Sequence, residues 1–168
     1  MGVSANTCFS QEVEKKELTQ VISVNPLALV YGTANISYEK ALKPNLGVEG
    51  EVVFVSQKMA DWEWTAFGVT ITAKKYTESS APLKFWYGGG IGILPISAKY
   101  TYFDWTEWKT KTETASGTFF SLSGSAGYRW LIGEKFTIEG SLGISYYAGS
   151  LTIAGEKLPF GGITPAIG

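Results

Sequence analysis

The sequence contains no histidine and a single cysteine among its 168 residues. Histidine is the commonest general base and a frequent metal ligand, so its absence removes most hydrolytic and metal-dependent sites. The serine–histidine and aspartate–histidine arrangements of membrane hydrolases and acyltransferases cannot be built without it. The lone Cys8 has no partner for an internal disulfide. We therefore expect no enzymatic activity, no metal site and no cofactor.

Charged residues are also scarce, at 17% of the chain, against about 25% in a typical soluble domain. The net charge of −1 leaves no basic surface, so we expect no nucleic-acid partner. No run of about 18 apolar residues is present, which excludes a membrane-spanning helix. A closed β-barrel also satisfies its backbone groups within a bilayer, and its half-apolar strands escape this test.

Residues 1–17 differ from the rest of the chain. They have neither the charged start nor the apolar stretch of a secretory signal peptide, and they end in the charged run EVEKKE. We interpret residues 1–17 as a leader or periplasmic segment and residues 18–168 as one folded domain.

Beyond this segment, apolar and polar residues alternate with a period of two, which is typical of β-strands with two different faces. The pattern is clearest at residues 119–132 and 136–147, on either side of a tight turn at 133–135. The alternation predicts eight strands, the last of them truncated, at residues 21–30, 34–39, 46–54, 67–74, 83–103, 119–132, 136–147 and 159–168.

The strand predicted at residues 83–103 contains an irregularity. Its apolar residues are odd-numbered from Phe85 to Ile93 and even-numbered from Ile96 to Tyr102, with Pro95 at the change. One extra residue in a strand forms a β-bulge, a position where proline is tolerated. We therefore predict a β-bulge at Pro95.

The predicted connections alternate in length. Short turns are expected at residues 43–45, 77–82 and 133–135, and longer loops at 57–64, 104–117 and 150–158. Short turns at one end and longer loops at the other are characteristic of outer-membrane barrels.

Alternation alone does not say which face points inward, because a lipocalin-like carrier places its apolar face inside. Here the polar face consists mainly of small Ser, Thr and Gly residues, which suit a narrow lumen better than a soluble exterior. Aromatic residues, Trp62, Trp64, Tyr100 and Tyr102 among them, gather near predicted strand ends, as in aromatic girdles. We favour an eight-stranded antiparallel up-and-down transmembrane β-barrel over the soluble carrier.

The polar face carries charges of both signs in one half of the predicted barrel. A lone buried charge is costly, so a narrow lumen would require these side chains to pair. The predicted lumen charge cluster consists of Glu39, Glu49, Glu51, Lys74, Lys84, Arg129 and Glu139.

Three segments carry a resemblance to a known group. Residues 25–32 (NPLALVYG) and 36–42 (ISYEKAL) look like an opening hairpin, and residues 161–168 (GGITPAIG) look like the start of a closing strand. On these residues the chain resembles the outer-membrane β-barrel superfamily, the small OmpA/OmpX-like barrels, in an uncharacterised branch. The resemblance covers residues 18–168 and implies an outer-membrane location in a Gram-negative bacterium. It departs from the family at Gly168, where an aromatic residue is expected.

Three functions remain open for this sequence. The first is a structural or surface-interaction barrel that binds outer-membrane lipid, acts as a monomer and contacts a surface ligand through its longer loops. Trp105 and Trp108 are the candidate contact residues, since exposed aromatic side chains often anchor contacts. The alternative for both residues is a place in the outer aromatic girdle. The second is a porin-like channel for small apolar solutes, or a lipid-handling barrel. Pro26 and Pro165 could weaken its closing seam and open it laterally, because neither donates a ladder hydrogen bond. The soluble lipocalin-like carrier is the third.

Overall fold

The computed structural model describes residues 18–25, 29–30, 32–78, 81–132, 136–153 and 155–167. The predicted leader at residues 1–17, Cys8, Pro26 and the turn at 133–135 lie outside these residues. No helix in the described parts is long and apolar enough to cross a membrane.

The described residues form eight consecutive strands, each antiparallel to the next in one sheet. This confirms the predicted all-β class, strand number and up-and-down order. The strands are β1 (Gln20–Val24), β2 (Thr33–Lys43), β3 (Leu46–Met59), β4 (Trp62–Tyr76), β5 (Lys84–Asp104), β6 (Lys109–Ile132), β7 (Phe136–Ile153) and β8 (Glu156–Ile167).

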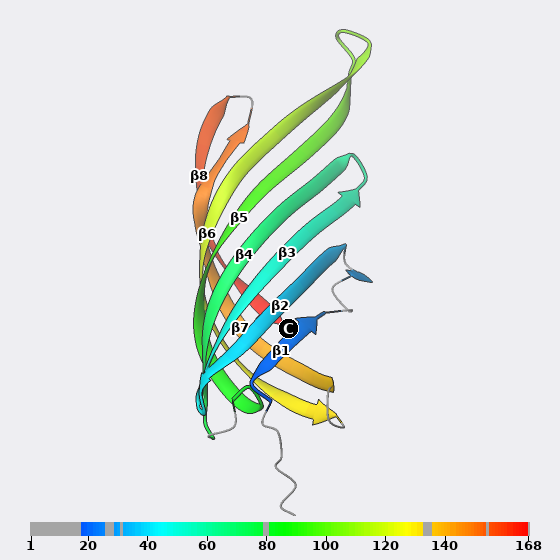
Figure 1. The fold of residues 1–168 in the computed structure, drawn as a ribbon. Helices are drawn as coiled ribbons and strands as arrows, with labels where there is room; N and C mark the ends of the chain where they lie inside the picture. Colours follow the sequence, from blue (N-terminus) through cyan, green and yellow to red (C-terminus); the bar gives the residue numbers. More distant parts are fainter. Residues whose placement is uncertain are drawn as a thin grey trace, which may run out of the picture.

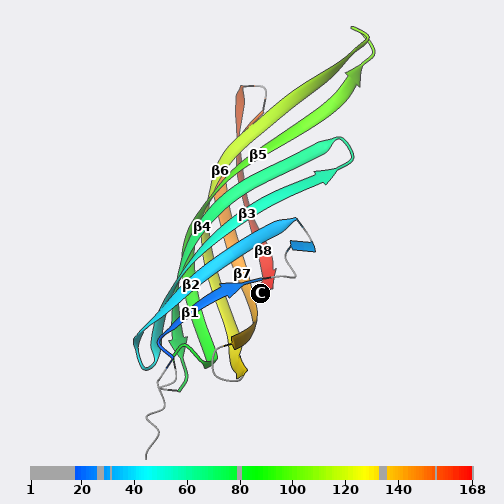
Figure 2. The ribbon, with the colours of Figure 1, turned by 45° about the vertical axis from the view of Figure 1, so that its right-hand side comes forward.

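The sheet is strongly curved, and β8 ends close to β1 in both ribbon views (Figures 1 and 2). The curvature brings side chains of distant strands together: the Arg129 guanidinium of β6 lies 2.8 Å from the Glu39 carboxylate of β2. Among the described residues, no register joins β1 to β8.

The two faces of the sheet differ as the alternation predicts. On β6, odd-numbered residues such as Ser123 and Arg129 lie on the concave inner face, and even-numbered residues such as Leu122 lie on the outer face. Arg129 is only 1% exposed, whereas Leu122 is 63% exposed. Small and charged residues therefore line the inside of the lower sheet, and large apolar residues cover its outside.

The β-bulge predicted at Pro95 is absent from β5, and that prediction is wrong. The register between β5 and β6 is constant over the whole length of β5, and Pro95 pairs with Thr118 within it. The register between β4 and β5 is also the same before and after Pro95. Proline lacks a backbone N–H, so it cannot donate a hydrogen bond to β4. Accordingly, the pairing of β4 with β5 is interrupted at Phe67 and Gly68, and it resumes at Val69 in the same register. A register shift occurs instead between Ala41 and Lys43 of β2.

The three predicted long loops are also wrong, because most of their residues continue the strands. The loop at 57–64 is a turn at Ala60 and Asp61, and the loop at 104–117 is reduced to residues 105–108. The loop at 150–158 is shortened in the same way, since β7 reaches Ile153 and β8 begins at Glu156. The hairpins project upward in Figure 1, and β5–β6 projects farthest.

The first strand is shorter than predicted. It ends at Val24, and Leu29 and Val30 have helical backbone instead of continuing it. Pro26 follows in the sequence, and proline cannot donate a hydrogen bond to a neighbouring strand. The side of the sheet formed by β1 and β2 is lower than the β3–β4 and β5–β6 hairpins (Figure 1).

Two glycines provide a matched test of this packing. A Cβ at Gly88 on the inner face would lie 2.2 Å from the backbone oxygen of Ala73, whereas a Cβ at Gly124 on the outer face would meet nothing within 4 Å. We expect Gly88→Ala to destabilise the fold by about 1–3 kcal/mol, because backbone must move. Gly124→Ala should stay within about 0.5 kcal/mol of the wild type in the same unfolding titration. Equal effects would contradict this register.

Candidate functional site

Five of the seven predicted lumen charges meet on the inner face near the short turns. The Lys74 ammonium lies 3.3 Å from the Glu39 carboxylate, 2.9 Å from Glu49 and 3.1 Å from Glu139. The Arg129 guanidinium lies 2.8 Å from Glu39 and 3.6 Å from Glu49, and it also pairs with Glu139. These five side chains, called the ion cluster below, come from β2, β3, β4, β6 and β7.

Neutral groups complete the ion cluster. The Tyr76 hydroxyl donates a hydrogen bond of 2.5 Å to Glu39, and Arg129 donates one of 3.1 Å to the backbone oxygen of Pro82. The Lys74 ammonium also lies 4.0 Å from the centre of the Trp86 ring, which is within cation–π range. Buried charges are tolerated when they are paired in this way.

The other two predicted charges lie elsewhere. Glu51 sits higher on the inner face and accepts a hydrogen bond of 2.8 Å from the Asn35 amide. Lys84 does not face the ion cluster, so its assignment was wrong. Its side chain is 48% exposed and pairs with Glu78 in the adjoining turn. Lys84 is the first residue of β5 and has a φ of 70°, and the strand's alternation does not govern its direction.

The charged side chains of the ion cluster are engaged with one another. Its carboxylates are all engaged by Lys74 or Arg129. No group of three or more side chains placed to hold a metal ion occurs in the described ranges. A mutually paired set of charges reaching across the interior ties five strands together.

Above the ion cluster, the apolar side of the sheet changes from the outer face to the inner face. Along β6, the outer face runs from Leu122 and Phe120 to Thr118, Ser116 and Thr114. The inner face runs the opposite way, from serines to apolar residues: Ser125, Ser123, Ser121, Phe119, Gly117 and Ala115. The change occurs at the Pro95–Thr118 pair, which we call the crossover level.

The same inversion occurs on β5 and explains the parity change in the sequence. Below the crossover level, Ile91 and Ile93 lie on the outer face, and above it Ser97 and Lys99 take these positions. Ile96 and Ala98 lie on the inner face. The apolar pattern shifts by one residue because the surroundings of the two faces exchange, while the strand itself stays in register.

Four aromatic residues predicted to form a girdle lie on the inner face instead. Trp62 stacks on Trp64 at 5.7 Å and on Tyr100 at 4.5 Å, and Tyr100 stacks on Tyr102 at 5.6 Å. The Tyr102 hydroxyl donates a hydrogen bond of 3.0 Å to Glu113. This aromatic ladder, Trp64–Trp62–Tyr100–Tyr102, lines the projecting β4–β5 wall above the crossover level.

The predicted contact residues Trp105 and Trp108 occupy the tip of the β5–β6 hairpin. They are 73% and 74% exposed and pack edge-to-face with each other at 5.9 Å. Phe103 packs edge-to-face against both rings. The tip therefore presents a compact, solvent-exposed group of three aromatic side chains.

Asp104 holds the turn that carries these tryptophans. Its carboxylate accepts hydrogen bonds of 2.8 Å from the Thr106 amide and 3.3 Å from the Glu107 amide, and it lies 2.5 Å from the Lys111 ammonium. The hydrogen bond from Lys111, together with the backbone amides, lowers the pKa of Asp104 to about 2. The carboxylate is therefore ionised throughout the physiological pH range.

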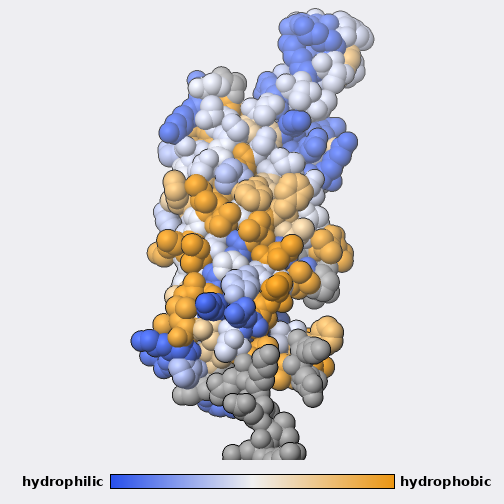
Figure 3. Space-filling view, viewed as in Figure 1, coloured by the Kyte–Doolittle hydropathy of each residue, from blue (hydrophilic) through white to orange (hydrophobic). Residues whose placement is uncertain are grey.

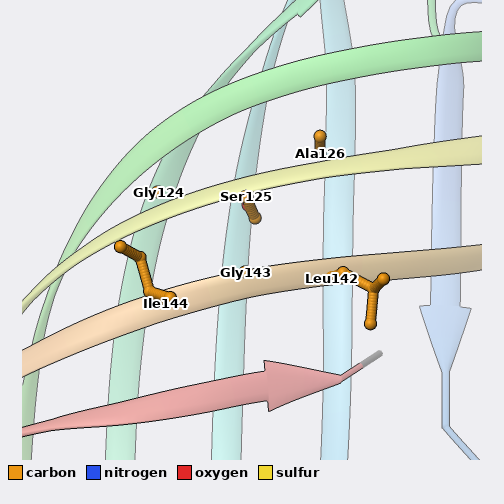
Figure 4. A pocket seen from close by; sticks show the side chains of 6 residues that line it. All are labelled: Gly124, Ser125, Ala126, Leu142, Gly143 and Ile144. Atoms are coloured by element: carbon orange, nitrogen blue, oxygen red, sulfur yellow. The ribbon is translucent and has the colours of Figure 1, made fainter.

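Neither the described seam proline nor the surface notch over β6 and β7 adds a reactive group. Pro26 lies outside the described residues, and Pro165 of β8 pairs with Ile144 and is exposed. A shallow notch lies over β6 and β7 (Figure 4), where Ala126 and Ser125 point to opposite sides of the strand. Its lining is mostly apolar or glycine and offers no group for chemistry: Gly124, Ser125, Ala126, Leu142, Gly143 and Ile144.

The fold and the site together define an all-β protein made of one curved, eight-stranded, up-and-down sheet around a buried ion cluster. The family described as "Protein of unknown function (DUF3575)" matches residues 3–152. Because the match covers most of the chain, the protein belongs to this family. No curated protein and no solved structure matches the chain.

Proposed function

We propose that this protein is an integral β-barrel of the bacterial outer membrane, with a lumen sealed by the ion cluster and a structural or surface-interaction role. The observation that carries the proposal is the arrangement of its two faces below the crossover level. Leu122, Ile144 and Phe67 are exposed on the outer face, while Lys74 and Arg129 are buried on the inner face. Such an arrangement is unfavourable in water and favourable in a bilayer.

The extent of the apolar surface supports the same proposal. Figure 3 shows apolar residues gathered in the lower and middle parts of the molecule, with hydrophilic residues above them. On β5 and β6 the outer face becomes polar at the crossover level. Going upward, Ser97 lies above Ile93 on β5, and Thr118 lies above Phe120 on β6. We place the outer boundary of the membrane there, with the upper hairpins in water.

Closure into a barrel is supported by contacts across the interior. The contact between Glu39 of β2 and Arg129 of β6 requires the sheet to curl around a narrow inside. A bilayer also disfavours open sheet edges, since unpaired backbone groups have no water to bind.

The ion cluster disfavours a conducting channel, because its five side chains fill the inside from opposite walls. It also disfavours a soluble lipocalin-like carrier, whose lower interior should be apolar. A lipid-handling role has one observation in its favour, the apolar inner face above the crossover level.

The test of the membrane barrel is the dependence of folding on detergent. We expect a β-type circular dichroism spectrum in detergent and aggregation without it, because the outer apolar surface has no other cover. The folded protein should also migrate differently on a gel before and after boiling. A β-rich monomer that is stable in plain buffer would contradict the proposal.

The surface role rests on the tip of the β5–β6 hairpin. Replacing Trp105 and Trp108 together with alanine should weaken the binding of whole cells to a protein- or glycan-coated surface by about tenfold or more, since buried aromatic anchors dominate contacts. The heat-modified gel shift should stay unchanged, because both side chains project into solvent. Undiminished cell binding would remove these residues from the surface role. The matched control is Thr114→Ala, on the outer face of the same hairpin.

A further inference from the structure

The part of the sheet above the crossover level has an apolar inside in a region that we place outside the bilayer. Its inner wall, called the apolar cup below, begins one residue pair below the crossover level and continues above it; it is formed by Leu94, Phe119 and Phe160, and then by Val55, Ile96 and Leu151. The outer face at the same height carries Ser97, Thr118 and other polar residues. We infer that the apolar cup binds the chain of one long-chain amphiphile, such as a fatty acid; this inference rests on the proposed membrane barrel.

The apolar cup retains apolar surface that its own side chains do not cover. Phe160 and Leu158 of β8 are 63% and 49% exposed, although both are on the inner face. Phe160 also packs edge-to-face against Phe119 at 5.8 Å, so the wall continues from β6 across to β8. Apolar surface held open toward water favours the entry of an apolar ligand.

The size of the apolar cup limits its occupant. An eight-stranded barrel has room inside for side chains or one small ligand, so a folded protein or a second copy of this chain does not fit. The wall carries no charged side chain between Leu94 and Ala98 or between Ala115 and Phe119. An uncharged, narrow, flexible chain matches this wall better than a sugar, which needs several hydrogen-bonding partners.

The floor and the rim of the apolar cup explain why the ligand is held rather than conducted. Below it, the inner face becomes polar at Ser121, and the ion cluster fills the inside farther down. Above it stand the aromatic ladder and Glu113, which offer amphipathic and polar surface to a head group that stays in water. The chain of the amphiphile therefore points downward and its head group upward.

Among the described residues, the wall of the sheet is lower on the side of β1 and β2 than at the β3–β4 hairpin. β2 begins at Thr33, which pairs with Val55, while β3 continues above this pair to Met59. The height difference between β2 and the β3–β4 hairpin is visible in Figure 1. The described wall of the sheet therefore ends near the crossover level at β2 and lower still at β1, whose last residue Val24 pairs with Ile36.

The experiment uses photolabelling of the whole protein in lipid nanodiscs with 10-azistearic acid, followed by peptide mass spectrometry. We expect label on inner-face residues such as Ile96 and Leu151, and this label should fall when excess unlabelled stearic acid is added. Label on outer-face residues such as Leu122 should resist competition, because it reports bulk lipid. Saturable labelling separates a bound ligand from the surrounding bilayer.

Two neighbouring residues supply the variants. Ile96→Asp should reduce the competable label by more than about tenfold, because a carboxylate in an apolar site is strongly unfavourable. Ser97→Asp, which places the same charge on the outer face, should leave it unchanged. The gel shift on boiling establishes that each variant is folded, and the wild-type competition does not depend on either variant.

The outcomes separate this inference from the proposed function. Label on Leu122 and Ile144 with no competable label on the inner face would overturn the apolar cup and leave the membrane barrel intact. Absence of label from the outer face below the crossover level would instead overturn the membrane barrel. The binding site would be supported if unlabelled stearic acid reduces the label on the inner face, and if this label is lost in Ile96→Asp but kept in Ser97→Asp.

Discussion

Arg129→Ala is expected to lower the free energy of unfolding of this protein by about 3–5 kcal/mol, the usual effect of removing one partner from a buried ion pair. Arg129 is 1% exposed and contacts Glu39, Glu49 and Glu139. Without it, Lys74 alone would have to balance three carboxylates. Denaturant unfolding of the protein in lipid vesicles, or loss of the heat-dependent gel shift at a lower temperature, measures the change.

The comparison variants sharpen this prediction. Lys84→Ala removes an exposed pair with Glu78 and should change stability by less than about 1 kcal/mol. Adding Glu39→Gln to Arg129→Ala should recover part of the loss, since it removes one unbalanced carboxylate. If Arg129→Ala melts like the wild type, the ion cluster does not hold the sheet together.

Leu122→Arg is expected to destabilise the protein in a bilayer by about 2–4 kcal/mol, the range for a basic residue near the midplane of a membrane barrel. Leu122 lies on the outer face and is 63% exposed, so the substitution disturbs no internal packing. In a soluble sheet, an exposed leucine replaced by arginine would have almost no effect. Unfolding in lipid vesicles measures the difference.

Position 114 is the control for depth. Thr114 lies on the same strand and the same face as Leu122, but above the crossover level. Thr114→Arg should therefore leave stability within about 0.5 kcal/mol of the wild type. If both substitutions have the same effect, the membrane boundary is not at the crossover level.

The strands and the direction of their two faces could be predicted from the sequence, because period-two alternation is a local property of the chain. Residues 119–132 and 136–147 alternate without interruption, and both lie within strands of the expected orientation, β6 and β7. Chain order then favoured an up-and-down sheet, since neighbouring strands with short turns pair with each other. These features needed no knowledge of long-range contacts.

The parity change at Pro95 shows where the same pattern becomes ambiguous. A β-bulge and an exchange of surroundings both move the apolar residues by one position. Only the register distinguishes them, and Pro95 pairs with Thr118 in an unbroken series. The bulge interpretation assumed one environment for the whole strand, whereas the apolar face changes along β5.

The prediction of long loops was wrong for a related physical reason. The segment at 109–116 is polar and rich in threonine, which suggested a loop beside a membrane. Threonine is also β-branched and forms strands where a partner strand is present. Here Thr101 and Thr112 face each other with hydroxyls 3.2 Å apart. Polarity predicted the solvent exposure of this segment, and it did not predict the backbone.

The ion cluster could be predicted in composition but not in pairing. Alternation placed Glu39, Lys74 and Arg129 on one face, and burial required charges to pair. Which atoms meet depends on how far each strand is staggered against the next, and contacts such as Arg129–Glu39 span 90 residues. The alternation rule also misplaced Lys84, because a strand's first residue is governed by its turn.

Every strand of this sheet pairs with its neighbours in the chain. The unit of the architecture is therefore the hairpin, whose two strands pair through contacts that are local in the sequence. Gain or loss of a hairpin such as β5–β6 would change the strand number by two without altering the register of any other pair. A gene encoding such a protein can change the circumference of the sheet by duplicating one short segment, and in a closed barrel the circumference determines what the inside can hold.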